Sequence, residues 1–113
     1  MPFIDCKISQ KLGGEQKEVL KTELGKAVSI IHKPESYLMV GICDGYDLYF
    51  AGKKLEKGAY VSVSLFGSAP SSSYEKMTES ICSILETELG IGGSEVYVTY
   101  HSVEDWGWDG ANF

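Results

Sequence analysis

Cysteine, proline and positive charge are all scarce in this sequence, and each shortage excludes a class of protein. The three cysteines, Cys6, Cys43 and Cys82, are odd in number, far apart and never spaced as C-x-x-C. This pattern argues against a disulfide framework, a zinc site and a dithiol redox motif. Ten Lys plus Arg against sixteen Asp plus Glu leave a net charge of −6, which disfavours binding to a nucleic-acid backbone. We therefore expect no metal, no cofactor and no nucleic-acid partner.

Long apolar runs are also missing. The longest, residues 37–43, is about a third of the roughly 20 residues that a membrane-spanning helix needs. Residues 1–5 have neither the basic start nor the apolar centre of a secretory signal. These absences predict a cytoplasmic protein without membrane contact, and they leave secretion without a signal peptide open.

The apolar residues that are present follow regular patterns in the first half of the chain. Residues 3–8 resemble a strand, and residues 15–31 carry apolar side chains at helical spacing up to the pair Lys33-Pro34. Residues 37–43 form a continuous apolar strand, and the aromatic segment 46–50 after it predicts a small hairpin.

The second half repeats this order. A strand at residues 60–65 is followed by a capping box at residues 72–75, an apolar helical stripe that Gly90 closes, and a strand at residues 96–100. The offset is 57 residues, both from Phe3 to Tyr60 and from His32 to Leu89. The sequence therefore predicts one domain over residues 1–113, built from two βαβ units at about residues 1–57 and 58–113.

Two such units predict an α/β (α+β) fold in which a four-stranded mixed sheet carries both helices on one face. The reason is that each helix has a single apolar stripe to bury. The strands at residues 37–43 and 96–100 have apolar or aromatic residues on both faces. We expect other subunits to cover the second face, so the chain should self-associate.

Pro2 is the first candidate for chemistry. An initiator Met is normally removed when Pro follows it, which would leave Pro2 with a free secondary amine. With Met1 in place, the Pro2 nitrogen is an amide and cannot act as a base.

Four motifs in order resemble one family. Met1-Pro2 opens directly into a strand, and Lys33-Pro34-Glu35-Ser36-Tyr37 is similar to G-K-P-x-x-Y with His32 in place of the Gly. Val96-Tyr97-Val98-Thr99-Tyr100 is similar to V-Y-I-x-Y, and Gly107-Trp108-Asp109-Gly110-Ala111-Asn112-Phe113 is similar to G-W-N-G-[ST]-x-F. Together they resemble the macrophage migration inhibitory factor family of the tautomerase superfamily, over nearly the whole chain.

The sequence departs from that family at three places. Leu65-Phe66-Gly67 stands for the family's S-I-G, with a shorter segment after it, and Thr99 stands where the best-known members have Asn. The C-A-L-C segment of vertebrate members is replaced by residues 59–62 without cysteine, so their proposed thiol-oxidoreductase activity has no support here.

The resemblance implies a homotrimer that acts as a phenylpyruvate-type keto–enol tautomerase, with active sites between neighbouring subunits. Pro2 would be the catalytic base, with its amine pKa brought near neutrality by an apolar pocket and by Lys33. Lys33 would bind the substrate carboxylate or enolate oxygen, and the backbone N–H of Phe66 would be an oxyanion donor. Tyr97 would reach the pocket from the adjacent subunit, where Thr99 offers one hydroxyl group.

The resemblance also implies an aromatic pocket wall of Tyr37, Trp108 and Phe113, which suits a small aromatic keto acid or enol. His32 closes a helix and His101 ends a strand, so both are expected at the solvated surface. Lys53, Lys54 and Lys57 are interpreted as a solvated loop.

Two other classes of function stay open. One is a signalling or binding protein of the same fold with a vestigial catalytic pocket. The other is a plain ferredoxin-like binding domain, since paired βαβ units occur in unrelated functions.

Overall fold

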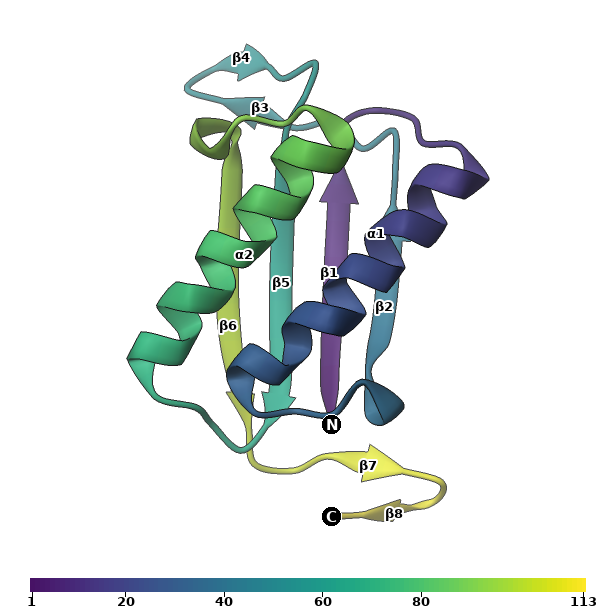
Figure 1. Cartoon of the computed structure of the whole chain (residues 1–113), viewed down its shortest axis with the longest axis vertical. Coiled ribbons are helices and arrows are strands. Elements are labelled where there is room, and N and C mark those ends of the chain that lie inside the picture. Colours follow the sequence, from purple (N-terminus) through teal and green to yellow (C-terminus); the bar gives the residue numbers. More distant parts are fainter.

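A four-stranded mixed sheet forms the centre of the computed structural model, which describes all residues 1–113. Its strand order is β2-β1-β5-β6 (Figure 1). Strand β1 (Pro2–Ile8) runs parallel to β2 (Met39–Cys43) and antiparallel to β5 (Ala59–Phe66), and β5 runs parallel to β6 (Val96–Val103). The predicted mixed sheet is confirmed.

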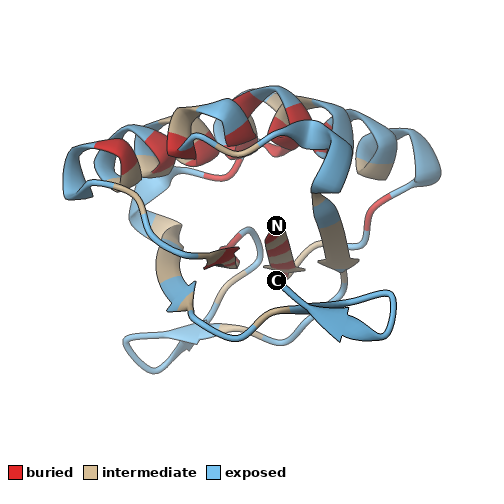
Figure 2. Ribbon diagram, turned by 90° about the horizontal axis from the view of Figure 1, so that it is seen from below, coloured by how far each residue is buried: buried red, intermediate tan, exposed pale blue.

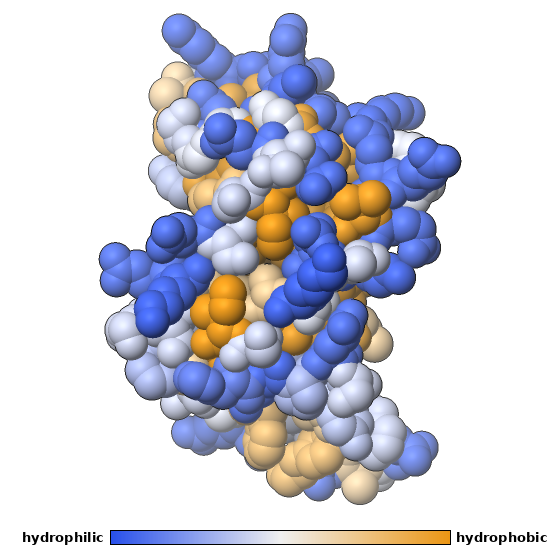
Figure 3. All heavy atoms as spheres, in the orientation of Figure 1, coloured by the Kyte–Doolittle hydropathy of each residue, from blue (hydrophilic) through white to orange (hydrophobic).

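Both long helices pack on one face of this sheet, as predicted (Figure 2). Helix α1 (Gly14–Ala27) continues into the 3-10 turn η1 (Val28–Ile31), and helix α2 (Ser71–Leu89) ends at Gly90. Their outward surfaces carry many hydrophilic side chains (Figure 3). Neither helix is long and apolar enough to cross a membrane.

The two halves of the chain match element by element. Strand, helix and strand start at Pro2, Gly14 and Met39 in the first half and at Ala59, Ser71 and Val96 in the second, each 57 residues later.

The core lies between the helices and the sheet. Alternate residues of β1 and β5 face it, and the apolar stripes of α1 and α2 meet them there. Its fully buried members include Ile4, Cys6, Leu24, Val63 and Ile81. Burial, and to a lesser extent Asp5, raises the pKa of the Cys6 thiol to about 12, so this cysteine behaves as a core residue rather than a nucleophile.

The capping box predicted at residues 72–75 is wrong. Pro70, with φ −62° and ψ 148°, is the N-cap of α2, and no side chain caps the helix. The Pro70 carbonyl instead accepts the backbone N–H of Ser73 at 2.9 Å. Because Pro70 takes the N-cap position two residues before Ser72, Ser72 lies inside the first turn.

Two local predictions near the hairpins also need correction. Tyr37 is not on a strand: it ends the 3-10 turn η2 (Glu35–Tyr37), and its N–H donates to the Pro34 carbonyl at 3.4 Å. The aromatic segment does enter the predicted hairpin, as β3 (Tyr49–Phe50), but Lys53 and Lys54 form its second strand β4 rather than a loop.

The sheet face opposite the helices has no cover in the single chain (Figure 2). It is aromatic or apolar toward its ends, with Met39 and Tyr97 68% and 64% exposed. Its middle is more polar, since Asp5 forms an ion pair with Lys7 at 2.9 Å. Tyr60 and Thr99 join their hydroxyls at 2.8 Å on the same face.

Candidate functional site

A cavity of about 710 Å³ opens at the end of the sheet where β1 and β2 start and β5 and β6 finish. A second small hairpin, β7 (Gly107–Trp108) with β8 (Ala111–Asn112), closes one side of it. The chain's two ends lie close to each other there (Figure 1, Figure 2). The lining residues are Met1, Pro2, Phe3, Ser36, Tyr37, Leu38, Met39, Ser64, Val103, Asp105, Trp106, Gly107 and Trp108.

Pro2 is buried at the edge of this cavity, and one backbone and one side-chain hydrogen bond link its neighbourhood to Phe66 and Lys33. The Phe66 N–H donates to the Met1 carbonyl at 3.0 Å, and the Lys33 ammonium donates to the Phe66 carbonyl at 2.9 Å. Lys33 has two further N–H donors. Three residues far apart in the sequence therefore converge at the N-terminus.

The surroundings of the N-terminus change the pKa of its amine. Burial lowers the pKa of the Met1 α-amine from its ordinary value of 8.0, and the nearby Lys33 cation lowers it further. Both causes disfavour the ammonium form, because burial removes water and Lys33 adds a like charge. An amine held at this position is therefore more often neutral, and available as a base, than one in water.

Four aromatic rings stand beside the N-terminus. Trp108 meets Tyr37 edge-to-face with centroids 6.0 Å apart, and it stacks with Phe113 at 6.1 Å. Phe113 in turn lies 5.8 Å from Phe66. The structure thus brings Tyr37, Trp108 and Phe113 together with Phe66 in one aromatic cluster. Tyr37 and Trp108 line the cavity, whereas Phe66 and Phe113 lie outside its lining.

Tyr97 and Thr99 lie elsewhere. Tyr97 packs against Phe50 with ring centroids 5.5 Å apart, near the opposite end of the sheet. The Thr99 hydroxyl lies 2.8 Å from the Tyr60 hydroxyl and 3.0 Å from Nε2 of His101. Neither residue lines the cavity of its own chain.

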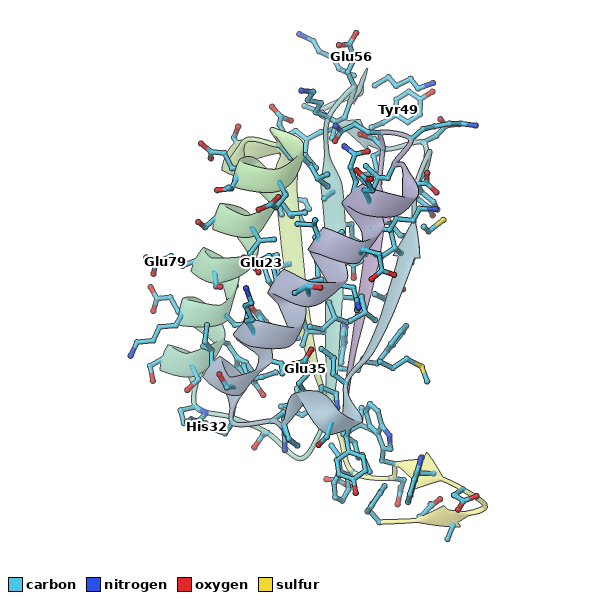
Figure 4. The ribbon with its side chains drawn as sticks, turned by 45° about the vertical axis from the view of Figure 1, so that its right-hand side comes forward. Glu23, His32, Glu35, Tyr49, Glu56 and Glu79 are labelled. Carbon is cyan, nitrogen blue, oxygen red and sulfur yellow. The ribbon has the colours of Figure 1, made fainter.

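The two histidines are exposed, as predicted, and neither reaches the cavity. His32, labelled in Figure 4, is the left-handed residue that ends η1, with φ 60°, and its Nε2 lies 3.4 Å from the Ser73 hydroxyl. His, Cys, Asp and Glu side chains do not gather anywhere into a group that could hold a metal ion.

Several lining residues were missed by sequence reasoning. Phe3 lies on the first strand with its side chain away from the core, a position that alternation along β1 could have suggested. Trp106 precedes the terminal motif by one residue, and its large ring so close to Trp108 was a second available signal. Asp105 had no signal of its own among the many acidic residues.

The sequence and the fold are both similar to those of known proteins. The family model described as macrophage migration inhibitory factor (MIF) matches residues 1–113. Among solved structures, Leishmania major MIF2 is 31% identical with a TM-score of 0.93, covering 100% of this chain and 97% of that one. The MIF-like protein of Entamoeba histolytica is 26% identical with a TM-score of 0.89, covering 99% and 98%. The Prochlorococcus marinus homologue is 27% identical with a TM-score of 0.88, covering 98% of each chain. No curated protein sequence matches.

Proposed function

Because the chain belongs to the macrophage migration inhibitory factor family of the tautomerase superfamily, we propose that it is a keto–enol tautomerase with Pro2 as its base. The observation that carries this proposal is the convergence of Pro2, Lys33 and Phe66 beside one aromatic cavity. In enzyme terms the protein is an isomerase.

In the proposed reaction, the neutral Pro2 nitrogen takes a proton from the carbon next to the substrate carbonyl. The electrons of that C–H bond form the carbon–carbon double bond, and negative charge develops on the carbonyl oxygen. Lys33 donates to this oxygen or to the substrate carboxylate, and prolinium returns the proton to the oxygen. The reverse sequence converts enol to ketone, and both directions need an amine that is largely neutral near pH 7.

Loss of Met1 is part of the proposal. The Met1 carbonyl accepts the Phe66 N–H that the reaction would use for the oxyanion, and Met1 also makes the Pro2 nitrogen an amide. Removing this one residue would expose the base and free the N–H donor together. The new amine would sit beside the same Lys33 and the same apolar lining that lower the pKa of the Met1 amine.

The aromatic cluster favours a flat aromatic substrate of the phenylpyruvate type. Tyr37 and Trp108 line the cavity with aromatic rings, and Phe113 stacks on Trp108 beside it. Cytoplasmic location is the matching prediction for a small-molecule enzyme of this kind.

The test is the rate of phenylpyruvate enol-to-keto conversion, corrected for the background in buffer. We expect activity from material whose intact mass shows that Met1 is absent, and loss of most of the rate in Pro2→Gly. An unchanged rate in Pro2→Gly would overturn the mechanism. No activity from Met1-free protein would favour the signalling or binding function with a vestigial pocket.

We further propose that the active form is a homotrimer in which Tyr97 and Thr99 reach the cavity of a neighbouring subunit. Support comes from their absence from the cavity of their own chain and from the exposed sheet face on which they lie. Dilution to folded monomers should abolish the activity while circular dichroism stays the same. Tyr97→Phe should raise the activation free energy of the reaction by about 0.5 to 1.5 kcal/mol, the scale of one hydrogen bond. A fully active monomer would contradict the shared site.

A further inference from the structure

One carboxylate interrupts the otherwise apolar and neutral lining of the cavity. Apart from the N-terminal amine, Asp105 is the only lining residue that carries a full charge near pH 7, while most of the others are aromatic or aliphatic. It lies on the segment between β6 and β7, next to Trp106. A lone carboxylate among aromatic rings is an unusual choice for a pocket that takes only anionic ligands, because it repels a second negative charge.

Asp105 has no cation of its own in the chain. The five ion pairs of the structure use other carboxylates. None of these five pairs includes the N-terminal amine, so Asp105 is not its partner either. Asp105 is therefore an exposed, unpaired carboxylate in the cavity lining, whereas Lys33 lies outside the lining and donates to the Phe66 carbonyl.

From this arrangement we propose that Asp105 is a specificity residue that selects aromatic ligands carrying an ammonium group. The aromatic ring would lie along Trp108, and the ammonium would sit between the Asp105 carboxylate and the indole of Trp106. There it gains a charge pair and a contact with a ring face. The inference concerns the same cavity as the proposed function and names its substrate class. Within the proposed function, the substrate would be an aromatic keto acid with an amine substituent whose ammonium lies at Asp105.

Binding can be measured without catalysis, because the chain's two tryptophans both line the cavity. Quenching of their fluorescence would be titrated with 2-phenylethylamine, which is a cation at pH 7, and with 2-phenylethanol, its neutral counterpart. The variant is Asp105→Asn, which keeps size and hydrogen bonding. The matched control is Glu104→Gln, which removes the neighbouring charge outside the lining.

We expect Asp105→Asn to weaken the binding of 2-phenylethylamine about fivefold, which is the scale of a partly exposed ion pair. The affinity for 2-phenylethanol should change by less than about twofold. Glu104→Gln should leave both affinities unchanged. Amine affinity that survives Asp105→Asn, or that falls equally in Glu104→Gln, would overturn the proposal. So would equal weakening of both probes, which would mean that Asp105 shapes the cavity without selecting charge. No quenching of the unmodified protein by any probe would also overturn it.

The same titration separates this inference from the proposed function. Pro2→Gly should keep the Asp105-dependent preference for the amine, because binding needs no proton transfer. An Asp105 effect in a protein without tautomerase activity would leave the inference standing and remove the function. If the protein is an active tautomerase but its affinity for the amine does not depend on Asp105, the proposed function stands and the inference is overturned.

Discussion

Lys33→Met removes the cation beside the N-terminal amine and keeps most of the apolar stem. Burial is the larger cause of the lowered pKa of the Met1 α-amine, and Lys33 is the smaller one. The substitution should therefore raise this pKa only part of the way toward 8.0. The Phe66 carbonyl also loses its 2.9 Å hydrogen bond from Lys33. A half-buried bond of this kind contributes about 1 kcal/mol to the free energy of unfolding, so the melting temperature should fall by about 4 °C.

The amine pKa can be followed by NMR in protein that retains Met1 and carries ¹³Cα-labelled methionine. Only Met1, Met39 and Met77 then give signals, and only the first should titrate near neutral pH. Lys53→Met is the control, because Lys53 lies on β4 at the far end of the molecule (Figure 1). An unchanged pKa in Lys33→Met, or a complete return to 8.0, would refute the ranking of the two causes.

The pKa change also predicts how stability depends on pH. Between its lowered folded pKa and 8.0, the amine binds fewer protons in the folded state than in the unfolded state, so stability rises with pH across that window. Because Lys33→Met raises the folded pKa of the amine, it should raise the lower limit of this pH window. In protein without Met1, the same substitution should lower kcat/KM about tenfold to a hundredfold, the range of one charge-assisted hydrogen bond.

Three further predictions concern the scaffold. Ile81→Ala, at a position with no exposed surface, should lower the free energy of unfolding in urea by about 3 kcal/mol, and a loss below about 1 kcal/mol would contradict the core described above. Gly90→Ala, at φ 69°, should cost about 1 kcal/mol in thermal unfolding, and an unchanged melting temperature would argue against the left-handed helix end. An added Cβ at Gly25 would lie 2.6 Å from Cδ of Glu35, which follows α1 in Figure 4. Gly25→Ala should therefore stabilise by about 1 kcal/mol only together with Glu35→Ala, and equal effects in both backgrounds would rule out this contact.

The spacing of apolar residues predicted the helices and the sheet, because each helix or strand buries one face and its apolar residues repeat along that face. Leu20 and Leu24 in the first half, and Met77 and Ile81 in the second, recur at helical spacing, and all four are buried. Local backbone geometry was less accessible. Tyr37 has the composition of a strand residue, but the hydrogen bond of its N–H to Pro34 places it in a 3-10 turn. A local hydrogen bond of this kind leaves little trace in hydropathy.

The cavity wall was only partly predictable for a related reason. Motif spacing pointed to Tyr37, Trp108 and Phe113, whose rings do form one cluster. Asp105 and Trp106 line the cavity because β6 ends beside Phe66, so that the chain after Val103 turns toward the N-terminus. That position depends on the pairing of β6 with β5, which no local pattern encodes.

Sheet register gives the strongest argument that the proposed site needs more than one chain. Pro2 pairs with Leu65 on β5, whereas Tyr97 pairs with Tyr60, five positions away along the same strand. At about 3.4 Å per residue these two levels are about 17 Å apart, beyond the reach of a tyrosine side chain. The family resemblance implies that Tyr97 joins Pro2 from the adjacent subunit, and this register is consistent with that proposal. A cross-link between residues 2 and 97 should therefore join two chains, and one formed efficiently within a single chain would disprove the arrangement.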